Sequence, residues 1–336
     1  MRSMTWIPLR ASGAASVRGV ATAISLREGD FGYYSKTRKR LRRPAVSHND
    51  NKWSEALANI RVGLFVTCLV DLMRPRIGFA TLKLLETAGC EVIVPDTQTC
   101  CGQPAWNSGD APGAVALAKK TIAEFEGFEY VVTPSGSCGD HIRTEYPTLL
   151  GEEPEWRDRA TALASRTYEL TDFLVNVLKV DSVPGDHEGS ITYHDSCTGL
   201  RSMGIKEQPR ALLAKMKGVS LKEMDGCEEC CGFGGTFSVK FGEVSAAIAE
   251  RKCNNVLASG AKAVVGGDLG CLLNIEGKLR RMGDETTQVL HVAEVLAGKD
   301  NPPGPLSGKG GDRSSPMRPA PGGQIPPRGG PAAGGA

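Results

Sequence analysis

Eleven cysteines in 336 residues are the feature of this chain that could carry chemistry. Eight of them form two sets with one shared pattern, in which a single cysteine precedes an adjacent pair, a glycine and then another single cysteine. The first set is Cys68, Cys100, Cys101 and Cys138, and the second set is Cys197, Cys230, Cys231 and Cys271. The intervening stretches are 31 and 36 residues long in the first set, and 32 and 39 in the second. Such matched spacing indicates a duplicated unit.

A site built from four thiolates is strongly negative and needs a metal ion or an inorganic core to neutralise it. Structural zinc sites usually take two close C-x2-C pairs, and only Cys227 and Cys230 have that spacing here. The ferredoxin run C-x2-C-x2-C-x3-C-P is absent from the sequence. Spacing alone therefore favours an iron–sulfur centre, with zinc and thiol redox chemistry as the alternatives.

Cysteines more than thirty residues apart can meet only if the fold brings them together. Between residues 61 and 298, short β-type runs alternate with helical stretches. The predicted strands are 61–68, 91–95, 191–197 and 219–226, and the segments 129–138 and 261–271 are each predicted to be a strand that runs into a turn. The predicted helices are 74–89, 111–127, 208–218 and 242–260. This alternation predicts an α/β fold with two tandem, pseudo-symmetric Rossmann-like domains and parallel sheets.

The cysteines stand where such a fold would gather them. Cys68, Cys138, Cys197 and Cys271 each follow a predicted strand at its carboxyl end, and ligands bind at that edge of open α/β sheets. Neighbouring side chains of a regular strand point to opposite faces, so each adjacent cysteine pair needs a turn to present both thiols to one site. The glycines that follow the pairs, Gly102 and Gly232, permit that turn. Backbone N–H groups of 135–140 and 232–235 are expected to face the sulfurs.

The two ends differ from this core. We predict a disordered extension over 1–58, two cysteine-rich domains over 59–185 and 186–298, and a disordered Pro/Gly-rich tail over 299–336. The composition of 1–58 also suits a mitochondrial presequence, so a presequence and an extension from an upstream start site both stay open.

Charge and hydropathy exclude several classes of partner. Residues 1–60 carry 11 basic and 4 acidic side chains, a net charge of +7, and residues 299–336 carry 5 and 2, a net charge of +3. Because the whole chain has a net charge of +2, residues 61–298 have a net charge of −8. An acidic core argues against nucleic acid as the main partner. No run of 18 apolar residues predicts a membrane span, and no secretory signal is found. Clustered cysteines without such a signal indicate a reducing compartment, the cytoplasm.

Four segments, together with the repeated pattern, resemble a known family. They are "YHDSC" (193–197), "CCGFGGTFSVK" (230–240), "GGDLGCLLNI" (266–275) and "LHVAEVL" (290–296). The pattern resembles the cysteine-rich CCG domains that occur in heterodisulfide reductase, in the iron–sulfur subunit of glycolate oxidase and, most closely, in the lactate utilisation protein A family.

The resemblance implies a function for the chain. It implies a cytoplasmic iron–sulfur, electron-transfer subunit that works with two other lactate-utilisation proteins, one of them ferredoxin-like, to oxidise L-lactate, a small 2-hydroxy acid, to pyruvate. It also implies that the eight repeated cysteines hold one or two [4Fe–4S] clusters. The alternatives are a cluster-based thiol/disulfide or glycolate oxidoreductase subunit and, in another class, a zinc-stabilised scaffold.

The chain departs from the family at the end of each set. Family members such as the heterodisulfide reductase protein often finish the motif with C-x2-C, whereas here it reads "CGDH" (138–141) and "CLLN" (271–274). Each set therefore lacks a fifth thiol. His141 stands at the missing position in the first set, where it is either a ligand or a residue of the helix surface.

Other residues near the motifs have two readings each. His194, with Asp195, precedes Cys197 and is the one weak candidate for proton transfer or for a hydrogen bond to the cluster; otherwise it is a strand residue with its polar atoms satisfied. Cys227 is either an additional ligand or a thiol beside the site. Arg201 either offsets the negative charge of the cluster or is solvated.

Two cysteines lie outside the repeated pattern. Cys90 follows the end of a predicted helix, and Cys253 lies within another. We expect both to be small core residues, because free cysteine is among the most buried residue types.

Overall fold

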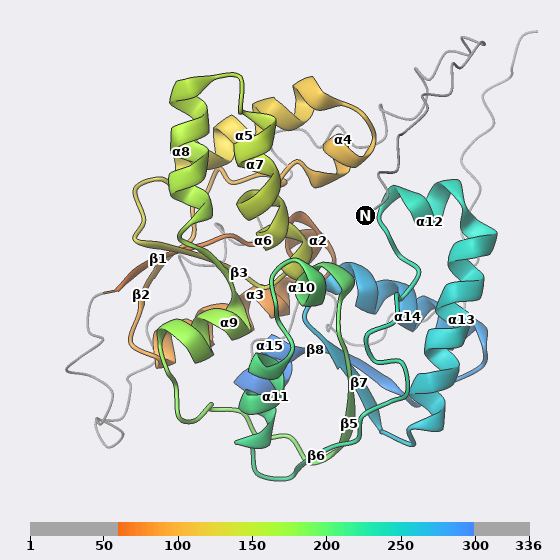
Figure 1. The fold of residues 1–336 in the computed structure, drawn as a ribbon. Helices are drawn as coiled ribbons and strands as arrows, with labels where there is room; N and C mark the ends of the chain where they lie inside the picture. Colours follow the sequence, from red (N-terminus) through yellow and green to blue (C-terminus); the bar gives the residue numbers. More distant parts are fainter. Residues whose placement is uncertain (1–59, 299–336) are drawn as a thin grey trace, which may run out of the picture. The chain divides into compact units, whose positions relative to one another are not determined.

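The computed structural model describes residues 60–298, so the predictions for 1–58 and 299–336 lie outside the described residues. This part of the chain forms two four-stranded sheets in which every strand pair is parallel (Figure 1). The strands of the first sheet are β1 (Arg61–Leu64), β2 (Glu91–Ile93), β3 (Tyr130–Thr133) and β4 (Thr167–Glu169). The strands of the second are β5 (Gly189–His194), β6 (Val219–Leu221), β7 (Ala263–Gly266) and β8 (Gln288–His291).

Both sheets have the same topology. The strand order is β2-β1-β3-β4 in the first and β6-β5-β7-β8 in the second, so each half places its first and third strands at the centre. The central strands are buried on both faces: all four residues of β7 are buried, and in β3 only Tyr130 is partly exposed. Continuous apolar runs of this kind are typical of parallel strands covered by helices on both sides. The predicted α/β class and duplicated architecture are confirmed.

Helices connect the strands and cover the sheets. In the first half they are α2 (Cys68–Met73), α3 (Pro75–Thr87), α4 (Gln103–Asn107), α5 (Ala111–Phe125), α6 (Gly136–Asp140), α7 (Tyr146–Leu149), α8 (Pro154–Ala164) and α9 (Leu170–Asp172). Two π-helical turns, His141–Glu145 and Phe173–Val177, continue α6 and α9. In the second half they are α10 (Cys197–Arg201), α11 (Glu207–Ala214), α12 (Thr236–Lys240), α13 (Gly242–Ala258), α14 (Leu269–Arg281) and α15 (Val292–Ala297).

Helices stand where turns were predicted at two of the cysteines. In the segments 129–138 and 261–271 the strands end at Thr133 and Gly266, and Cys138 and Cys271 lie in helices in place of the predicted turns. The reason is local: the side chains of Ser135 and Asp268 accept hydrogen bonds from backbone N–H groups two or three residues later and so start a helix.

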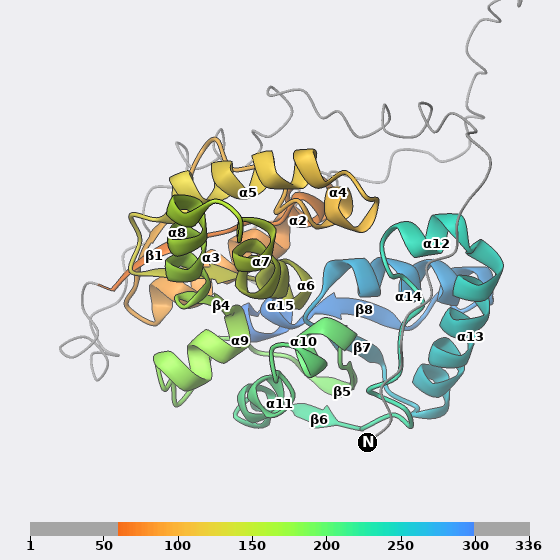
Figure 2. The same cartoon turned by 45° about the horizontal axis from the view of Figure 1, so that its top comes forward.

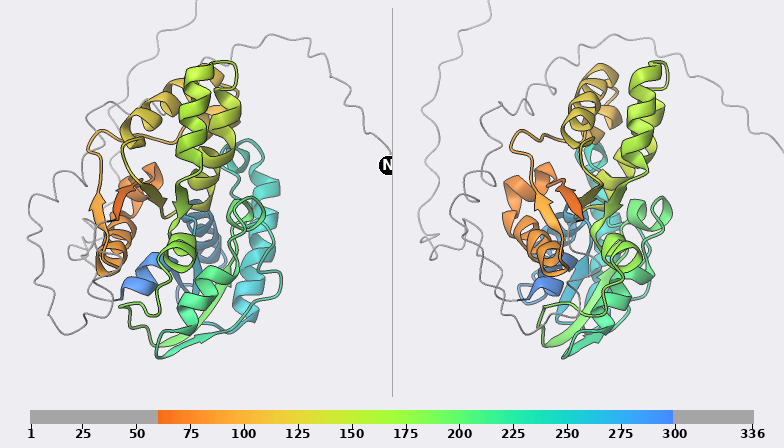
Figure 3. Two further views of the ribbon diagram at one scale, coloured as in Figure 1. Left: turned by 60° about the vertical axis from the view of Figure 1, so that its left-hand side comes forward. Right: turned by 90° about the vertical axis from the view of Figure 1, so that its left-hand side faces the viewer.

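The two halves share one hydrophobic core. Buried residues of both sheets, including Val132 and Val264, belong to a single cluster. Helix α15 at the end of the second half packs against α3 of the first half, as Figures 2 and 3 show from three directions. The Lys83 Nζ of α3 donates a hydrogen bond to the Ala297 carbonyl, at 2.8 Å. The boundary between 185 and 186 stays a prediction. Within 60–298, no helix is both long and apolar enough to cross a membrane.

Candidate metal centre

The structure brings the four cysteines of the first set together. Cys68 is the first residue of α2, Cys138 is the third residue of α6, and the adjacent pair lies just before α4. The Sγ atoms of Cys68 and Cys100 are 3.8 Å apart. Those of Cys101 and Cys138 are 3.6 Å apart. The carboxyl ends of β1 and β3 therefore deliver distant thiols to one place, as the sequence predicted.

The second set repeats this arrangement. Cys197 is the first residue of α10 and Cys271 is the third residue of α14, the same helix positions as in the first set. The Cys271 thiol hydrogen-bonds with that of Cys231 and lies within electrostatic range of Cys197 and Cys230. Cys230 is exposed, whereas Cys231 and Cys271 are buried. All eleven cysteines are free thiols.

Turns at Gly102 and Gly232 orient the thiols of the adjacent cysteine pairs. Gly102 has φ +93° and Gly232 has φ +86°, backbone angles that L side chains rarely adopt. The turn lets the Gly102 N–H donate to the Cys100 Sγ at 3.5 Å. In the second set the Gly232 N–H donates to the Cys230 Sγ at 3.3 Å. The predicted glycine turns are therefore present in both sets. The N–H donors expected from 232–235 are found in the second set, whereas the donor in the first set is Gly102 and not a residue of 135–140.

A side chain holds the turn in each half. The Tyr146 hydroxyl donates to the Cys101 carbonyl at 2.7 Å. In the second half the Asn274 Nδ2 donates to the Cys231 carbonyl at 2.8 Å. These contacts fix the main chain behind the thiols, and the sequence offered no signal for them because the partners lie 45 and 43 residues away.

The thiols of the first set shift one another's pKa values. Hydrogen bonds from the Cys101 and Cys68 thiols hold the pKa of Cys100 well below its usual range. The hydrogen bond with Cys100 and burial raise the pKa of Cys68, and the same causes together with Cys138 raise that of Cys101. The metal-free set therefore keeps protons on Cys68 and Cys101. A bound cation would reverse this, because metal binding releases protons from its thiol ligands.

Two buried histidines accompany the cysteine sets. His194 ends β5, and one of its ring nitrogens lies with the Cys231 and Cys271 sulfurs in a group whose ligand atoms are all within 4.8 Å of one another. His141 is fully buried in the π-helical turn after α6, with its ring 5.5 Å from that of Tyr146. The alternative that placed His141 on a helix surface is wrong, because the turn directs the ring inward.

Neither histidine has satisfied polar atoms. Both ring nitrogens of His141 and of His194 lack a hydrogen-bond partner within 60–298. Burial lowers the pKa of His194 to about 3, helped by Lys252 and opposed by the Cys227 carbonyl. Burial also lowers the pKa of His141 to about 4, and Cys100 opposes this shift. Both rings are thus neutral at pH 7, the form in which imidazole binds metals.

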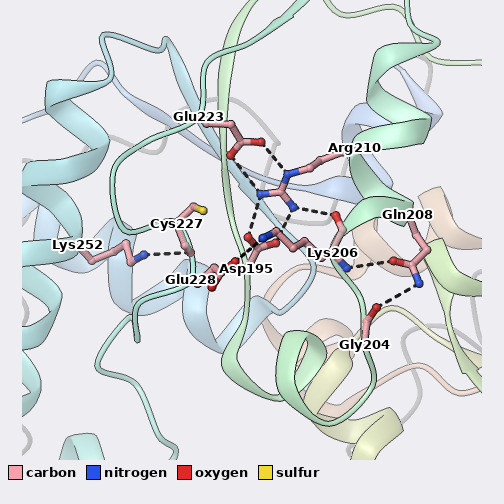
Figure 4. Close-up of polar contacts among 9 residues, drawn as sticks. All are labelled: Asp195, Gly204, Lys206, Gln208, Arg210, Glu223, Cys227, Glu228 and Lys252. Atoms are coloured by element: carbon pink, nitrogen blue, oxygen red, sulfur yellow. Dashed lines mark hydrogen bonds and ion pairs between the residues drawn. The ribbon is translucent and has the colours of Figure 1, made fainter.

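A network of charges lies beside the second set (Figure 4). The Arg210 guanidinium binds the buried Asp195 carboxylate through two hydrogen bonds of 2.8 and 2.9 Å. The same guanidinium holds Glu223 at 2.7 Å. The Asp195 N–H donates to the Cys227 carbonyl at 3.1 Å, so this network also positions the loop that leads to the adjacent cysteine pair.

Lys252 is a functional candidate that the sequence analysis did not identify. It is fully buried in α13, and its Nζ donates to the Gly226 carbonyl at 2.5 Å. The same Nζ donates to the Cys227 carbonyl at 3.2 Å (Figure 4). Burial lowers the pKa of Lys252, and the thiols of Cys227 and Cys231 act against this shift. A lysine in the middle of a helix is usually solvated, so the sequence gave no sign of a buried cation here.

The remaining predicted residues fall in different surroundings. Cys90 and Cys253 are buried in the core, as expected, and the Cys253 thiol donates to the Ile275 carbonyl at 3.5 Å. Cys227 is partly buried beside the second set. Arg201 is exposed at the end of α10, within electrostatic range of Glu228.

The donor sets fit an iron–sulfur group. Each set presents four soft sulfur donors, at least one of them buried, and a backbone N–H group directed at a sulfur. Thiolate ligands select iron–sulfur clusters, zinc or copper(I), and hydrogen bonds to the sulfurs tune cluster potentials. Cys68, Cys100, Cys101 and Cys138 would hold one such group, and Cys197, Cys230, Cys231 and Cys271 the other.

Comparison with known proteins agrees with this arrangement. A family model described as a cysteine-rich domain matches the chain twice, at residues 62–143 and 191–276, which include both sets. Lactate utilization protein A of Bacillus cytotoxicus is 47% identical over 237 residues, covering 70% of this chain and 98% of that protein. The proteins of the same name from Bacillus pumilus and Bacillus subtilis are 49% and 48% identical, and each is covered to 99%. The chain therefore belongs to the lactate utilization protein A family.

Proposed function

We propose that this protein is the iron–sulfur, electron-transfer subunit of a complex that oxidises L-lactate to pyruvate. One observation carries the proposal: in each half, thiols from three separate strand–helix connections lie close together. The name of its relatives, lactate utilization protein A, supports lactate as the substrate of the complex. We infer that two further lactate-utilisation subunits, one of them ferredoxin-like, are its partners, and that the complex works in the cytoplasm.

The chain's own residues would prepare the site for one-electron chemistry. A [4Fe–4S] cluster, when bound, accepts and returns single electrons, and lactate oxidation releases two. The buried thiols Cys101, Cys231 and Cys271 would keep water away from the centre. The N–H groups of Gly102 and Gly232 would stabilise the extra negative charge on the sulfurs in the reduced state.

A role for His194 as a base on the substrate was the weak expectation from the sequence. The side chain is only 1% exposed and lies with the Cys231 and Cys271 sulfurs. Burial of this degree favours a role toward the thiols over a role toward lactate.

Metal analysis tests the proposal directly. Anaerobically purified protein should contain iron and acid-labile sulfide, with an EPR signal on reduction. Cys101→Ser and Cys231→Ser should each remove the iron of one centre, whereas the matched controls Cys90→Ser and Cys253→Ser, at buried cysteines outside the sets, should retain it. Zinc without sulfide would instead favour the structural-scaffold alternative.

One observation favours a second candidate function. The Cys230 thiol is exposed, unlike the buried thiols of its own set, so a thiol or disulfide could reach it. A cluster-based thiol/disulfide reductase would use such a position. Reduction of a disulfide by the isolated protein, lost in Cys230→Ser, would favour this candidate over electron transfer from lactate.

A further inference from the structure

We propose that His194 supplies a nitrogen ligand to the metal centre of the second cysteine set, so that this centre has mixed sulfur and nitrogen ligation. The proposal rests on the proposed function, because it takes an iron–sulfur group as the occupant. It adds a ligand outside the eight repeated cysteines and makes the two centres chemically different.

The first support is the position of the ring. One nitrogen of His194 and the Sγ atoms of Cys231 and Cys271 all lie within 4.8 Å of one another, and all three residues are buried. Sulfur and imidazole ligands lie about 2.0–2.3 Å from a metal ion such as zinc, so tetrahedral ligands of one ion are roughly 3.5–3.8 Å apart. The three atoms are therefore close enough for at least two of them to bind the same metal ion, such as one iron of the group. They form the one group of at least three candidate ligands with such spacing within 60–298.

The second support is the unsatisfied polarity of the ring. Neither nitrogen of His194 makes a hydrogen bond of normal geometry in the described part of the chain, and the Cys227 carbonyl that interacts with the ring can accept from only one of them. Leaving a buried polar group unpaired costs about 1–3 kcal/mol, so such groups are rare in native proteins without a specific reason. A metal bond to one nitrogen supplies that reason.

His291 shows what a structural histidine looks like in the same fold. It ends β8 as His194 ends β5, and it is equally buried. Yet its Nε2 lies 3.1 Å from the Pro134 carbonyl, and its Nδ1 accepts a hydrogen bond of 3.1 Å from the Ala293 N–H. The ordinary packing of this protein thus satisfies a strand-end imidazole when no other role exists for it.

The third support is the contrast between the halves. His194 stands three residues before the first cysteine of its set, and the matching residue of the first half is Phe65. The Phe65 ring packs 5.5 Å from that of Phe125 and offers no donor atom. The unsatisfied histidine of the first half, His141, comes from another position and joins no such three-ligand group among residues 60–298. Only the second set therefore has a strand-borne nitrogen donor at this position.

Mixed ligation has an electronic consequence. A neutral imidazole in place of a thiolate makes a cluster less negative, and in Rieske centres histidine ligation accompanies a higher reduction potential. We therefore expect the second centre to be reduced more easily than a form in which residue 194 is a thiolate ligand.

The test uses the full-length protein, purified anaerobically, with all histidines labelled with ¹⁵N. Pulsed EPR of the reduced protein should show a hyperfine coupling from a histidine nitrogen. The coupling should vanish in His194→Ala and persist in the matched control His291→Asn. His194→Cys should also lose the coupling, keep its iron and sulfide, and show a lower reduction potential; it also serves where the alanine variant fails to fold.

Contrary outcomes are separable. A labelled protein that contains iron and sulfide but shows no histidine coupling would overturn the His194 proposal alone. So would a coupling that survives in His194→Ala and disappears in His141→Ala. A protein without iron and sulfide would overturn the proposed function together with this inference.

Discussion

Gly136 of α6 and Gly199 of α10 are in close backbone contact where the two halves of the protein meet. A Cβ atom on Gly136 would be 2.8 Å from the Gly199 Cα and 3.0 Å from its nitrogen. Since α6 contains Cys138 and α10 begins at Cys197, this contact holds the two cysteine sets next to each other. A hydrogen bond of 3.0 Å from the Ser137 N–H to the Asp268 carboxylate supports the same junction.

We expect Gly136→Ala to destabilise the junction. The added methyl group would meet backbone atoms of Gly199, which cannot move aside, and overpacking of this kind costs about 1–3 kcal/mol of unfolding free energy. Gly199→Ala should cost less, because its Cβ would meet only the Ser196 hydroxyl at 2.7 Å and the Gly136 Cα at 4.0 Å. Urea unfolding of the metal-free protein measures both.

Gly277→Ala is the control for this pair. Gly277 lies in α14, and no described atom lies within 4 Å of its added Cβ, so the variant should gain about 0.5–1 kcal/mol from helix propensity. Equal losses in Gly136→Ala and Gly199→Ala would contradict the close backbone contact.

Arg210→Met should strongly destabilise the second half. It would leave the Asp195 carboxylate, 1% exposed, without its cation, and breaking a buried ion pair in this way costs about 3–5 kcal/mol. The matched control is Arg157→Met, whose partner Asp158 is exposed and whose loss should cost under about 1 kcal/mol. Chemical unfolding compares the two, and a similar small loss in both variants would argue against a buried charge at Asp195.

His291→Asn should weaken the acid sensitivity of the fold. Burial lowers the pKa of His291 from 6.5 to about 4, so between these pH values the unfolded chain binds a proton that the folded chain refuses. Stability should therefore fall as pH drops through this window, by about 1.4 kcal/mol per pH unit for one histidine. Asparagine keeps an acceptor for the Ala293 N–H but does not titrate. Urea unfolding from pH 7 to 4.5 measures how the unfolding free energy changes with pH, and in the variant this change should correspond to about one proton fewer than in the wild type. An equal pH dependence in the two proteins would refute the lowered pKa of His291.

Glu169→Gln should change the pH dependence in the opposite direction. Burial raises the pKa of Glu169 from 4.5 to about 7, despite hydrogen bonds from Thr171 and from the Asp172 N–H. The stabilisation from its bound proton is complete below pH 4.5 and is lost as pH rises through 7. The glutamine variant should therefore gain relative to the wild type as pH rises across this window, by about 1.4 kcal/mol per pH unit. A constant difference between the two proteins at all pH values would contradict the raised pKa.

The convergence of the thiols was predictable from the sequence, because it depends on features of long range and regular spacing. Apolar runs place the central strands, and parallel strands must end at one edge. The helix positions of Cys68 and Cys138 were not predictable, since α2 and α6 have six and five residues and show no helical periodicity. The edge strands β4 and β8 were also missed, because three and four residues are too few to show a clear strand pattern.

The surroundings of single polar residues could not be read from spacing. A lysine within a helical run is normally solvated, yet Lys252 is buried, because loop carbonyls 25 and 26 residues away accept its hydrogen bonds. The inward direction of His141 depends on a π-helical turn, for which the residues carry no known signal. Such details arise from tertiary packing within each half, which residue spacing does not reveal.

The packing of α15 on α3 limits how this duplicated protein can change. The last helix of the second copy covers the first copy, so a stop codon before Val292 would uncover an apolar surface more than 200 residues upstream. We expect that, once α15 of the second copy covered α3 of the first, neither copy could be lost or expressed alone. Mutations could then make the two copies different in sequence, but a folded protein had to retain both copies.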